Sequence, residues 1–153
     1  MDAAAIEREK DLLPLGWGRF GKSIEKLPEL LGPEEELLAA CVGLNPSFEH
    51  RSITLAGGLR ELTKSTNLLL AATDRRLLLI ATSAGGSPRD HSELAYDGMA
   101  LEQLGKRELK LTWPEWSMLV KGLAKSMAPG FEQALRGRLA GLRPGACPGR
   151  RAA

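Results

Sequence analysis

The sequence predicts a mainly β (α+β) fold, in which an antiparallel sheet or open barrel of about seven strands is closed by one C-terminal helix. Three observations carry this prediction. Two five-residue aliphatic runs, Leu68–Ala72 and Leu77–Ala81, flank a short charged turn. Glu108–Trp113 alternates polar and apolar residues, as a half-buried strand does. The segment from Phe131 to Leu142 repeats apolar residues at helical spacing. Strands in series followed by a terminal helix favour an antiparallel architecture.

The N-terminal part, residues 1–31, is predicted to be a helical lead-in. Pro14 and Pro28 limit its regular stretches, and Gly32-Pro33 ends it. Four apolar residues recur at helical spacing and are expected to lie on one face against the core: Phe20, Ile24, Leu27 and Leu31.

The first strands are predicted from Glu36 onward. Glu36–Leu44 is mostly apolar and is expected to end at the turn signal Asn45-Pro46. Ser52–Leu55 alternates like a half-buried strand. The segment Asn67–Thr82 fits a hairpin better than a single helix, because such a helix would be apolar on nearly every face. Ser83–Ser92, rich in Gly, Pro, Ser and Asp, is expected to be an exposed loop.

The C-terminal half is predicted to supply the remaining strands and the closing helix. Met99–Leu104 and Glu108–Trp113 are the next two strands. Trp116–Met127 fits either a helix or a last strand centred on Met118–Val120 and ended by Gly122. In the final helix Pro129 suits the first turn, and Gln133, Arg136 and Arg138 are expected to face away from the apolar stripe. Residues 143–153 are expected to be a disordered basic tail.

Composition excludes several function classes. The net charge of +2, from 21 basic and 19 acidic residues, gives no strong field for nucleic acid. The two histidines, His50 and His91, have no metal-ligand spacing to cysteine or aspartate, so no metal or cofactor is expected. Cys41 lies in an apolar run and Cys147 in a Pro/Gly/Arg stretch, which suggests reduced thiols and a cytoplasmic protein.

The predicted hairpin resembles a segment of a known protein family. Leu68–Thr82, LLLAATDRRLLLIAT, resembles the strand–turn–strand segment of bacterial pleckstrin-homology-like (PH-like) domains, and GRAM-type modules carry similar hairpins. Leu27–Gly43, LPELLGPEEELLAACVG, looks like the entry to the same fold. The resemblance implies a seven-stranded bent antiparallel barrel over residues 32–142, with Met118–Lys121 as the seventh strand. It also implies a non-catalytic role in binding lipid headgroups, peptides or partner proteins.

Candidate binding residues follow from this resemblance. His50 and Arg51 belong to the expected loop between the first two strands, and Arg75 and Arg76 to the hairpin turn. Because the family carries an arginine at the second of these turn positions, Arg76 is expected to form a structural ion pair. The partner is expected to be a protein, a peptide or a membrane surface, and the oligomeric state stays open.

One motif supports an alternative function. Gly16–Ser23, GWGRFGKS, matches the phosphate-loop pattern, in which backbone N–H groups cradle phosphates and Lys and Ser contact phosphate and Mg²⁺. A small nucleotide-binding protein would use Gly16, Gly21, Lys22 and Ser23 in this way. The apolar strand that should precede the loop is missing, since Asp11–Leu15 contains Pro14. The competing interpretation is a helical lead-in whose Trp17 and Phe20 pack on the barrel.

Overall fold

The computed structural model describes residues 3–50, 67–83, 85–114 and 116–142. Three helical elements come first: α1 (Ala3–Asp11), the short 3₁₀ helix η1 (Gly18–Phe20) and α2 (Gly21–Leu30). The strands follow, and the helix α4 (Ala128–Leu142) closes the described chain. The strands are β1 (Leu37–His50), β2 (Asn67–Thr73), β3 (Leu77–Thr82), β4 (Pro88–Leu94), β5 (Ala100–Gly105), β6 (Glu108–Trp113) and β7 (Trp116–Lys121).

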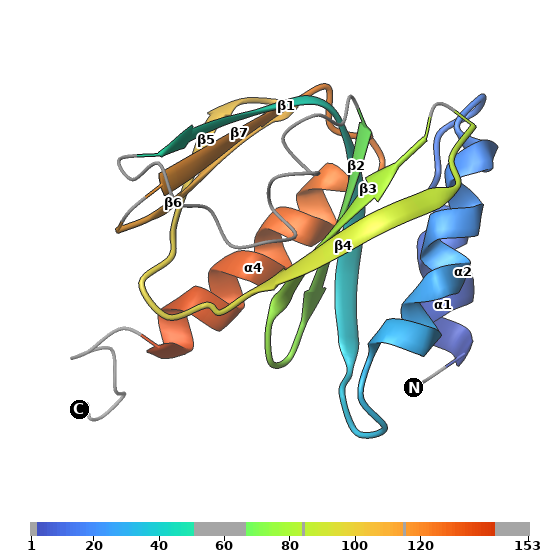
Figure 1. Ribbon diagram of the computed structural model, residues 1–153, viewed down its shortest axis with the longest axis horizontal. Coiled ribbons are helices and arrows are strands. Elements are labelled where there is room, and N and C mark those ends of the chain that lie inside the picture. Colours follow the sequence, from blue (N-terminus) through green and yellow to red (C-terminus); the bar gives the residue numbers. More distant parts are fainter. Residues whose placement is uncertain (1–2, 51–66, 84, 115, 143–153) are drawn as a thin grey trace.

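Within the described residues, the strands form one sheet in the order β4-β3-β2-β1-β7-β6-β5. Every neighbouring pair is antiparallel. The sheet is strongly bent, and α4 lies inside the bend (Figure 1). The predicted antiparallel fold with a closing helix and an N-terminal helical segment is therefore confirmed.

Strand β1 belongs to both halves of the sheet. Its first half pairs with β2 and its second half with β7, and the register shifts between Leu44 and Ser47. The expectation that Asn45-Pro46 ends the first strand was wrong. Proline lacks a backbone N–H, but it is tolerated at an irregularity in a strand, so β1 bends there and continues to His50.

The prediction of an exposed loop over Ser83–Ser92 was wrong for residues 88–92. The turn ends at Ser87, and β4 begins at Pro88 and pairs with β3 from Thr82 to Leu77. Its side chains are alternately half-buried and exposed. Because β4 is an edge strand, it tolerates a proline at its first residue and charged residues along its length. The predicted strand Ser52–Leu55 lies outside the described residues.

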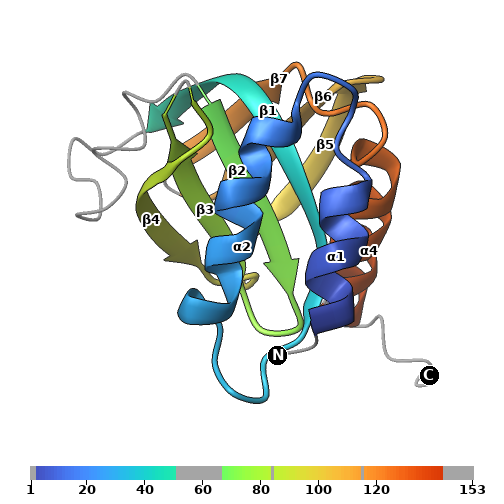
Figure 2. The same cartoon turned by 90° about the vertical axis from the view of Figure 1, so that its right-hand side faces the viewer.

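The hairpin of β2 and β3 is buried on both faces, which explains its two unbroken aliphatic runs. Helices α1 and α2 cover the outer face of the β1–β3 part of the sheet (Figure 2), whereas α4 packs on the inner face. Phe20, Ile24, Leu27 and Leu31 are buried, which confirms the predicted stripe. Phe131, Leu135 and Leu139 of α4 are buried in the same core.

Helix α2 continues through Pro28 to Leu30. The expectation that Pro28 shortens this helix was wrong. Pro28 lies near the C-terminal end of a ten-residue helix, and its missing N–H costs one hydrogen bond without stopping the chain from completing a last turn.

Helix α1 satisfies the edge of β1 that β2 leaves uncovered. The buried carboxylate of Glu9 accepts a hydrogen bond from the Ala40 N–H at 2.8 Å. The neighbouring Arg8 donates to the Leu38 carbonyl at 3.2 Å. Further along the same edge, the Ala124 N–H donates to the Val42 carbonyl at 2.8 Å. These contacts take the place of a neighbouring strand. No helix in the described part of the chain has the length and apolar character needed to cross a bilayer.

Candidate functional site

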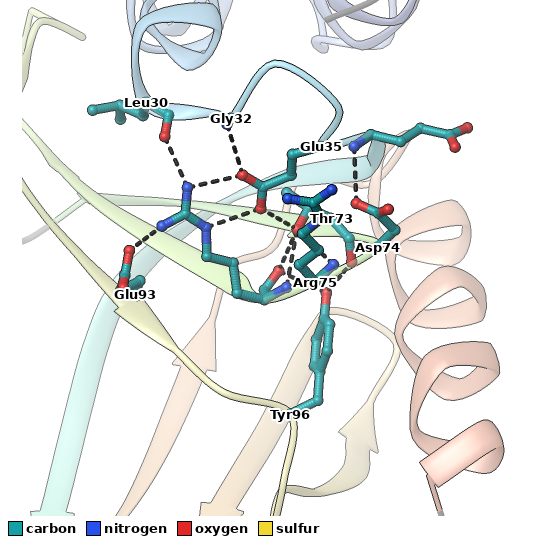
Figure 3. A network of polar contacts seen from close by, with 10 residues as sticks. Leu30, Gly32, Glu35, Thr73, Asp74, Arg75, Glu93 and Tyr96 are labelled. Atoms are coloured by element: carbon teal, nitrogen blue, oxygen red, sulfur yellow. Dashed lines mark hydrogen bonds and ion pairs between the residues drawn. The ribbon is translucent and has the colours of Figure 1, made fainter.

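A polar network surrounds the turn between β2 and β3 (Figure 3). At its centre Arg76 and Glu35 form a two-pronged ion pair. Arg76 Nε lies 2.9 Å from Glu35 Oε2, and a terminal guanidinium nitrogen lies 2.8 Å from Glu35 Oε1. The ion pair expected for Arg76 is therefore present, and it joins the hairpin to the turn that precedes β1.

Arg76 also reaches two other elements. It donates to the Leu30 carbonyl at the end of α2, at 2.8 Å, and it contacts the Glu93 carboxylate on β4. All three guanidinium nitrogens thus have partners within the protein. This arrangement fixes α2, the α2–β1 turn and β4 against the hairpin, which favours a structural role for Arg76 over ligand binding.

Glu35 is a buried carboxylate whose charge is compensated. Burial alone would raise its pKa. Hydrogen bonds from Arg76, the Gly32 N–H and the Thr73 hydroxyl outweigh burial and lower the pKa of Glu35 to about 2. The Thr73 hydroxyl lies 2.7 Å from the carboxylate, and the Gly32 nitrogen lies 3.0 Å from it. Glu35 therefore stays ionised at all physiological pH values.

The other residues of this turn differ in exposure. Asp74 accepts a hydrogen bond from the Glu36 N–H at 2.9 Å and returns one from its own N–H to the Glu36 carbonyl at 3.0 Å. The side chain of Arg75 is exposed. Of the two arginines proposed for binding, Arg75 is thus the one available to solvent.

Tyr96 completes the network through its hydroxyl group, which contacts backbone carbonyls of the turn. Its hydroxyl lies 2.6 Å from the Thr73 carbonyl and 2.8 Å from the Arg76 carbonyl. The guanidinium of Arg138 lies 5.8 Å from the centre of its ring. Arg138 is half-buried, so it does not point fully away from the core as predicted. Sequence spacing gave no signal for a contact between residues so far apart.

Among the described residues, the other candidate residues do not take part in this network. His50 is the last residue of β1, where its backbone pairs with Trp116 of β7. It therefore belongs to a strand and not to a loop, and Arg51 lies outside the described residues. His91, which sits between Asp90 and Ser92 in the sequence, is exposed on β4. Successive residues of a strand point to opposite faces, so these three side chains do not converge as a catalytic triad requires.

The phosphate-loop motif spans η1 and the start of α2. The Ser23 hydroxyl is buried and donates to the Gly86 carbonyl at 2.8 Å, in the turn between β3 and β4. Gly16 is exposed and has a positive φ of 89°, Gly21 is buried, and Lys22 is exposed. The residues before the motif, after α1 ends at Asp11, form no strand.

Two aromatic residues of the motif pack inward. Phe20 is fully buried, and the half-buried Trp17 packs against it with a ring-centre distance of 5.8 Å. The hydroxyl that would bind Mg²⁺ is used inside the protein. This geometry favours packing of the motif on the sheet over phosphate binding.

Comparisons with known proteins were made for the sequence and for the fold. No protein-family model matches the chain, and no curated protein is similar to it. Among solved structures, the chain is similar to the Vps36 N-terminal PH domain, with 18% identity and a TM-score of 0.47. The match covers 74% of this chain and 85% of that chain.

The chain's own architecture, a bent seven-stranded antiparallel sheet closed by a C-terminal helix, is consistent with the fold that the hairpin resemblance implies. The architecture describes a scaffold, so the functional site must be found from local chemistry.

The strand β5 offers an exposed edge. The sheet order ends at β5, so within the described residues its second edge has no neighbouring strand. Glu102, Gln103 and Leu104 are exposed. An exposed strand edge presents backbone N–H and C=O groups that a further strand can use.

A groove runs between this strand and the first turns of α4. It has a volume of about 380 Å³. The ion pair between Arg136 Nε and the Glu132 carboxylate, 2.9 Å apart, lies in its wall. Gln103 pairs directly with the buried Leu109, so it occupies an inward-facing position of β5 at the rim of the groove. The lining residues are Gln103, Lys106, Ala128, Pro129, Glu132, Gln133 and Arg136.

The described residues show no group suited to metal or thiolate chemistry. No cluster of His, Cys, Asp or Glu in the described ranges could hold a metal ion. Cys41 is fully buried, and burial raises the pKa of its thiol to about 12. This thiol is therefore protonated and inert at neutral pH.

Proposed function

We propose that the chain is a non-catalytic binding module that takes an extended segment of a partner protein along the exposed edge of β5, beside α4. The observation that carries this proposal is the juxtaposition of an exposed strand edge with a groove on its inward side. A bound segment would add as a strand, with backbone hydrogen bonds to β5 and alternate side chains in the groove.

The two edges of the sheet differ in a way that supports this choice. The edge strand β4 begins with Pro88 and carries Arg89, Asp90 and Glu93, which are features that oppose strand addition. In contrast, β5 carries a single charged residue, Glu102, and no proline. The edge of β5 is therefore the better site for a partner strand.

The groove chemistry indicates which segments would fit. Two amide side chains, Gln103 and Gln133, and the ion-paired Glu132 and Arg136 can exchange hydrogen bonds with polar residues. Ala128 and Pro129 supply a small apolar surface at the N-terminal end of α4. A segment of mixed polar and small apolar residues matches this lining better than a strongly hydrophobic one.

The finer parts of the proposal rest on sequence features. The resemblance of LLLAATDRRLLLIAT to bacterial PH-like and GRAM-type hairpins supports membership of that group. The two differently placed cysteines support a cytoplasmic location. We further propose that residues 1–31 are a lead-in to a PH-like unit of residues 32–142, and that residues 143–153 form a tail.

The experiment is a selection of peptides from a random library on the purified chain, followed by amide hydrogen exchange with the selected peptides. Binding is expected to slow exchange in residues 100–105 and to leave β4 unchanged. Gln133→Trp, which fills the groove, should weaken binding at least about tenfold, which is about 1.4 kcal/mol. Ala140→Trp, on the exposed α4 surface away from the groove, should not. Slowed exchange in β4 alone, or equal loss in both variants, would contradict the proposal.

A further inference from the structure

One end of the molecule is formed by three chain segments that are far apart in sequence. They are the α1–α2 loop with the start of α2 (residues 11–22), the β5–β6 turn with its flanking residues (104–108) and the segment from the end of β7 to α4 (121–127). All three lie at the top of the molecule in both views (Figures 1 and 2). We call this region the loop end. The β2–β3 turn lies at the bottom in both views.

Hydrogen bonds join the three segments. The Ser126 hydroxyl donates to the Leu12 carbonyl. The Leu123 N–H donates to the Arg107 carbonyl at 3.1 Å, and Arg107 Nε donates to the Leu123 carbonyl at 2.7 Å. The loop end is therefore a connected surface and not a set of independent loops.

The loop end contains all of the large hydrophobic side chains that are exposed in the described residues. Leu15 is 104% exposed, Leu104 is 47% exposed and Leu12 is 37% exposed. Trp17, which is half-buried, belongs to the same loop as Leu12 and Leu15. Exposed leucines are unremarkable when scattered, but these are gathered at one end of a protein whose other described large apolar side chains are at least partly covered.

The same segments are basic. The three segments carry six exposed cations but two carboxylates, those of Asp11 and Glu108. No ion pair within the described residues involves Lys22, Lys106, Lys121 or Lys125. The exposed cations are Arg19, Lys22, Lys106, Arg107, Lys121 and Lys125.

We propose that the loop end is a contact surface for an anionic lipid bilayer. Its exposed leucines would enter the headgroup layer while its lysines and arginines pair with lipid phosphates and carboxylates. Aliphatic and tryptophan side chains in segments that also carry basic residues have the chemistry of segments that lie at a membrane interface. The contact goes beyond the peptide site proposed at β5, and the lipid surface is identified from the charge and exposure of these segments alone.

The positive charge of the loop end favours bilayers that contain anionic lipid. Each lysine or arginine held near an anionic leaflet contributes about 1 kcal/mol, equivalent to about a fivefold change in partitioning, and the contribution falls with ionic strength. Two or three partly inserted leucines add a hydrophobic contribution that salt does not remove. Binding should therefore require both anionic lipid and exposed leucines.

The test is co-flotation of the full chain with vesicles of phosphatidylcholine containing about 30 mol% phosphatidylserine, and with vesicles of phosphatidylcholine alone. We expect binding to the mixed vesicles that weakens as salt rises, and at least tenfold weaker binding to the neutral vesicles. Lys121→Glu/Lys125→Glu and Leu12→Ser/Leu15→Ser should each weaken binding at least about tenfold. Arg75→Glu, which changes an exposed arginine at the opposite end, should bind like the unchanged chain.

A fluorescent label provides a second readout that does not depend on the two double variants. An environment-sensitive dye attached to Leu15→Cys in a Cys147→Ser background should brighten with anionic vesicles, because the buried Cys41 does not react. The same dye on Arg75→Cys should not brighten. Failure to bind anionic vesicles would overturn the proposal and leave an acidic protein surface as the partner of the loop end. An equal response at positions 15 and 75, or binding unaffected by both loop-end variants, would also overturn it.

Discussion

The buried Glu35 carboxylate allows a quantitative prediction of how stability depends on pH. In the folded protein its pKa is about 2, compared with an ordinary value of 4.5. A tenfold change in proton affinity corresponds to about 1.4 kcal/mol, so this difference stabilises the folded state by about 3 kcal/mol at neutral pH. The Glu35 side chain is only 2% exposed, so solvent screening does not reduce the figure strongly.

The sign of the pH dependence follows from the lowered pKa. The stabilisation is complete above pH 4.5 and is lost as the pH falls towards about 2, because the unfolded chain binds the proton more tightly. At pH 3 roughly 1.4 kcal/mol remains. Glu35→Gln keeps the shape of the side chain and removes its charge. The difference in free energy of unfolding between the two proteins should therefore be about 3 kcal/mol at pH 7 and less than half of that at pH 3.

Urea denaturation followed by circular dichroism at several pH values measures this difference. The matched control is Glu93→Gln, which removes the other carboxylate on Arg76. Its side chain is 63% exposed, so its loss should cost less than about 1 kcal/mol. A Glu35→Gln difference that is the same at pH 3 and pH 7 would refute the reasoning, because it would show that the carboxylate charge is not the source of the stability.

Three further predictions concern the turn between β3 and β4 and the motif packed against it. Gly86→Ala should destabilise by about 2 kcal/mol or more in urea denaturation, because a Cβ would collide with the Arg19 carbonyl and φ is +88°, whereas Gly85→Ala should cost under about 1 kcal/mol. Ser23→Ala should cost about 1–3 kcal/mol, since it leaves the Gly86 carbonyl without a donor in a buried site. Lys22→Ala should leave calorimetric titration with Mg-ATP and Mg-GTP unchanged and featureless. Nucleotide binding that disappears in this variant would restore the phosphate-loop function.

Short-range sequence patterns predicted most of the fold. The errors occurred where contacts with neighbouring strands, and not the local sequence, determine the structure. Glu108–Trp113 alternates because β6 has one buried face, and the β2–β3 hairpin is apolar throughout because helices cover both faces. In contrast, Pro88–Leu94 is polar and carries a proline, so nothing in its composition distinguishes a strand at a sheet edge from a loop. Pairing with β3 makes it a strand.

The candidate site was less predictable for the same reason. The resemblance at the hairpin turn correctly implied an ion pair at Arg76, but the partner residue Glu35 lies 41 residues earlier. The groove between Gln103 and Gln133 depends on how α4 closes the bent sheet, and no sequence motif indicates it. The gathering of Leu15 and Leu104 at one end likewise arises from the fold and not from any local pattern.

The contacts of α1 with β1 bear on whether this protein can self-associate through a strand edge. Glu9 and Arg8 bind backbone groups of Leu38 and Ala40 that would otherwise be free to hydrogen-bond with another chain. The first part of the strand that they cover, residues 37–42, is wholly apolar, which is the composition of segments that stack into aggregates when they are exposed. Helix α1 thus occupies a strand edge that could otherwise pair with another chain. Expression strategies that trim the protein to its sheet and closing helix would remove α1.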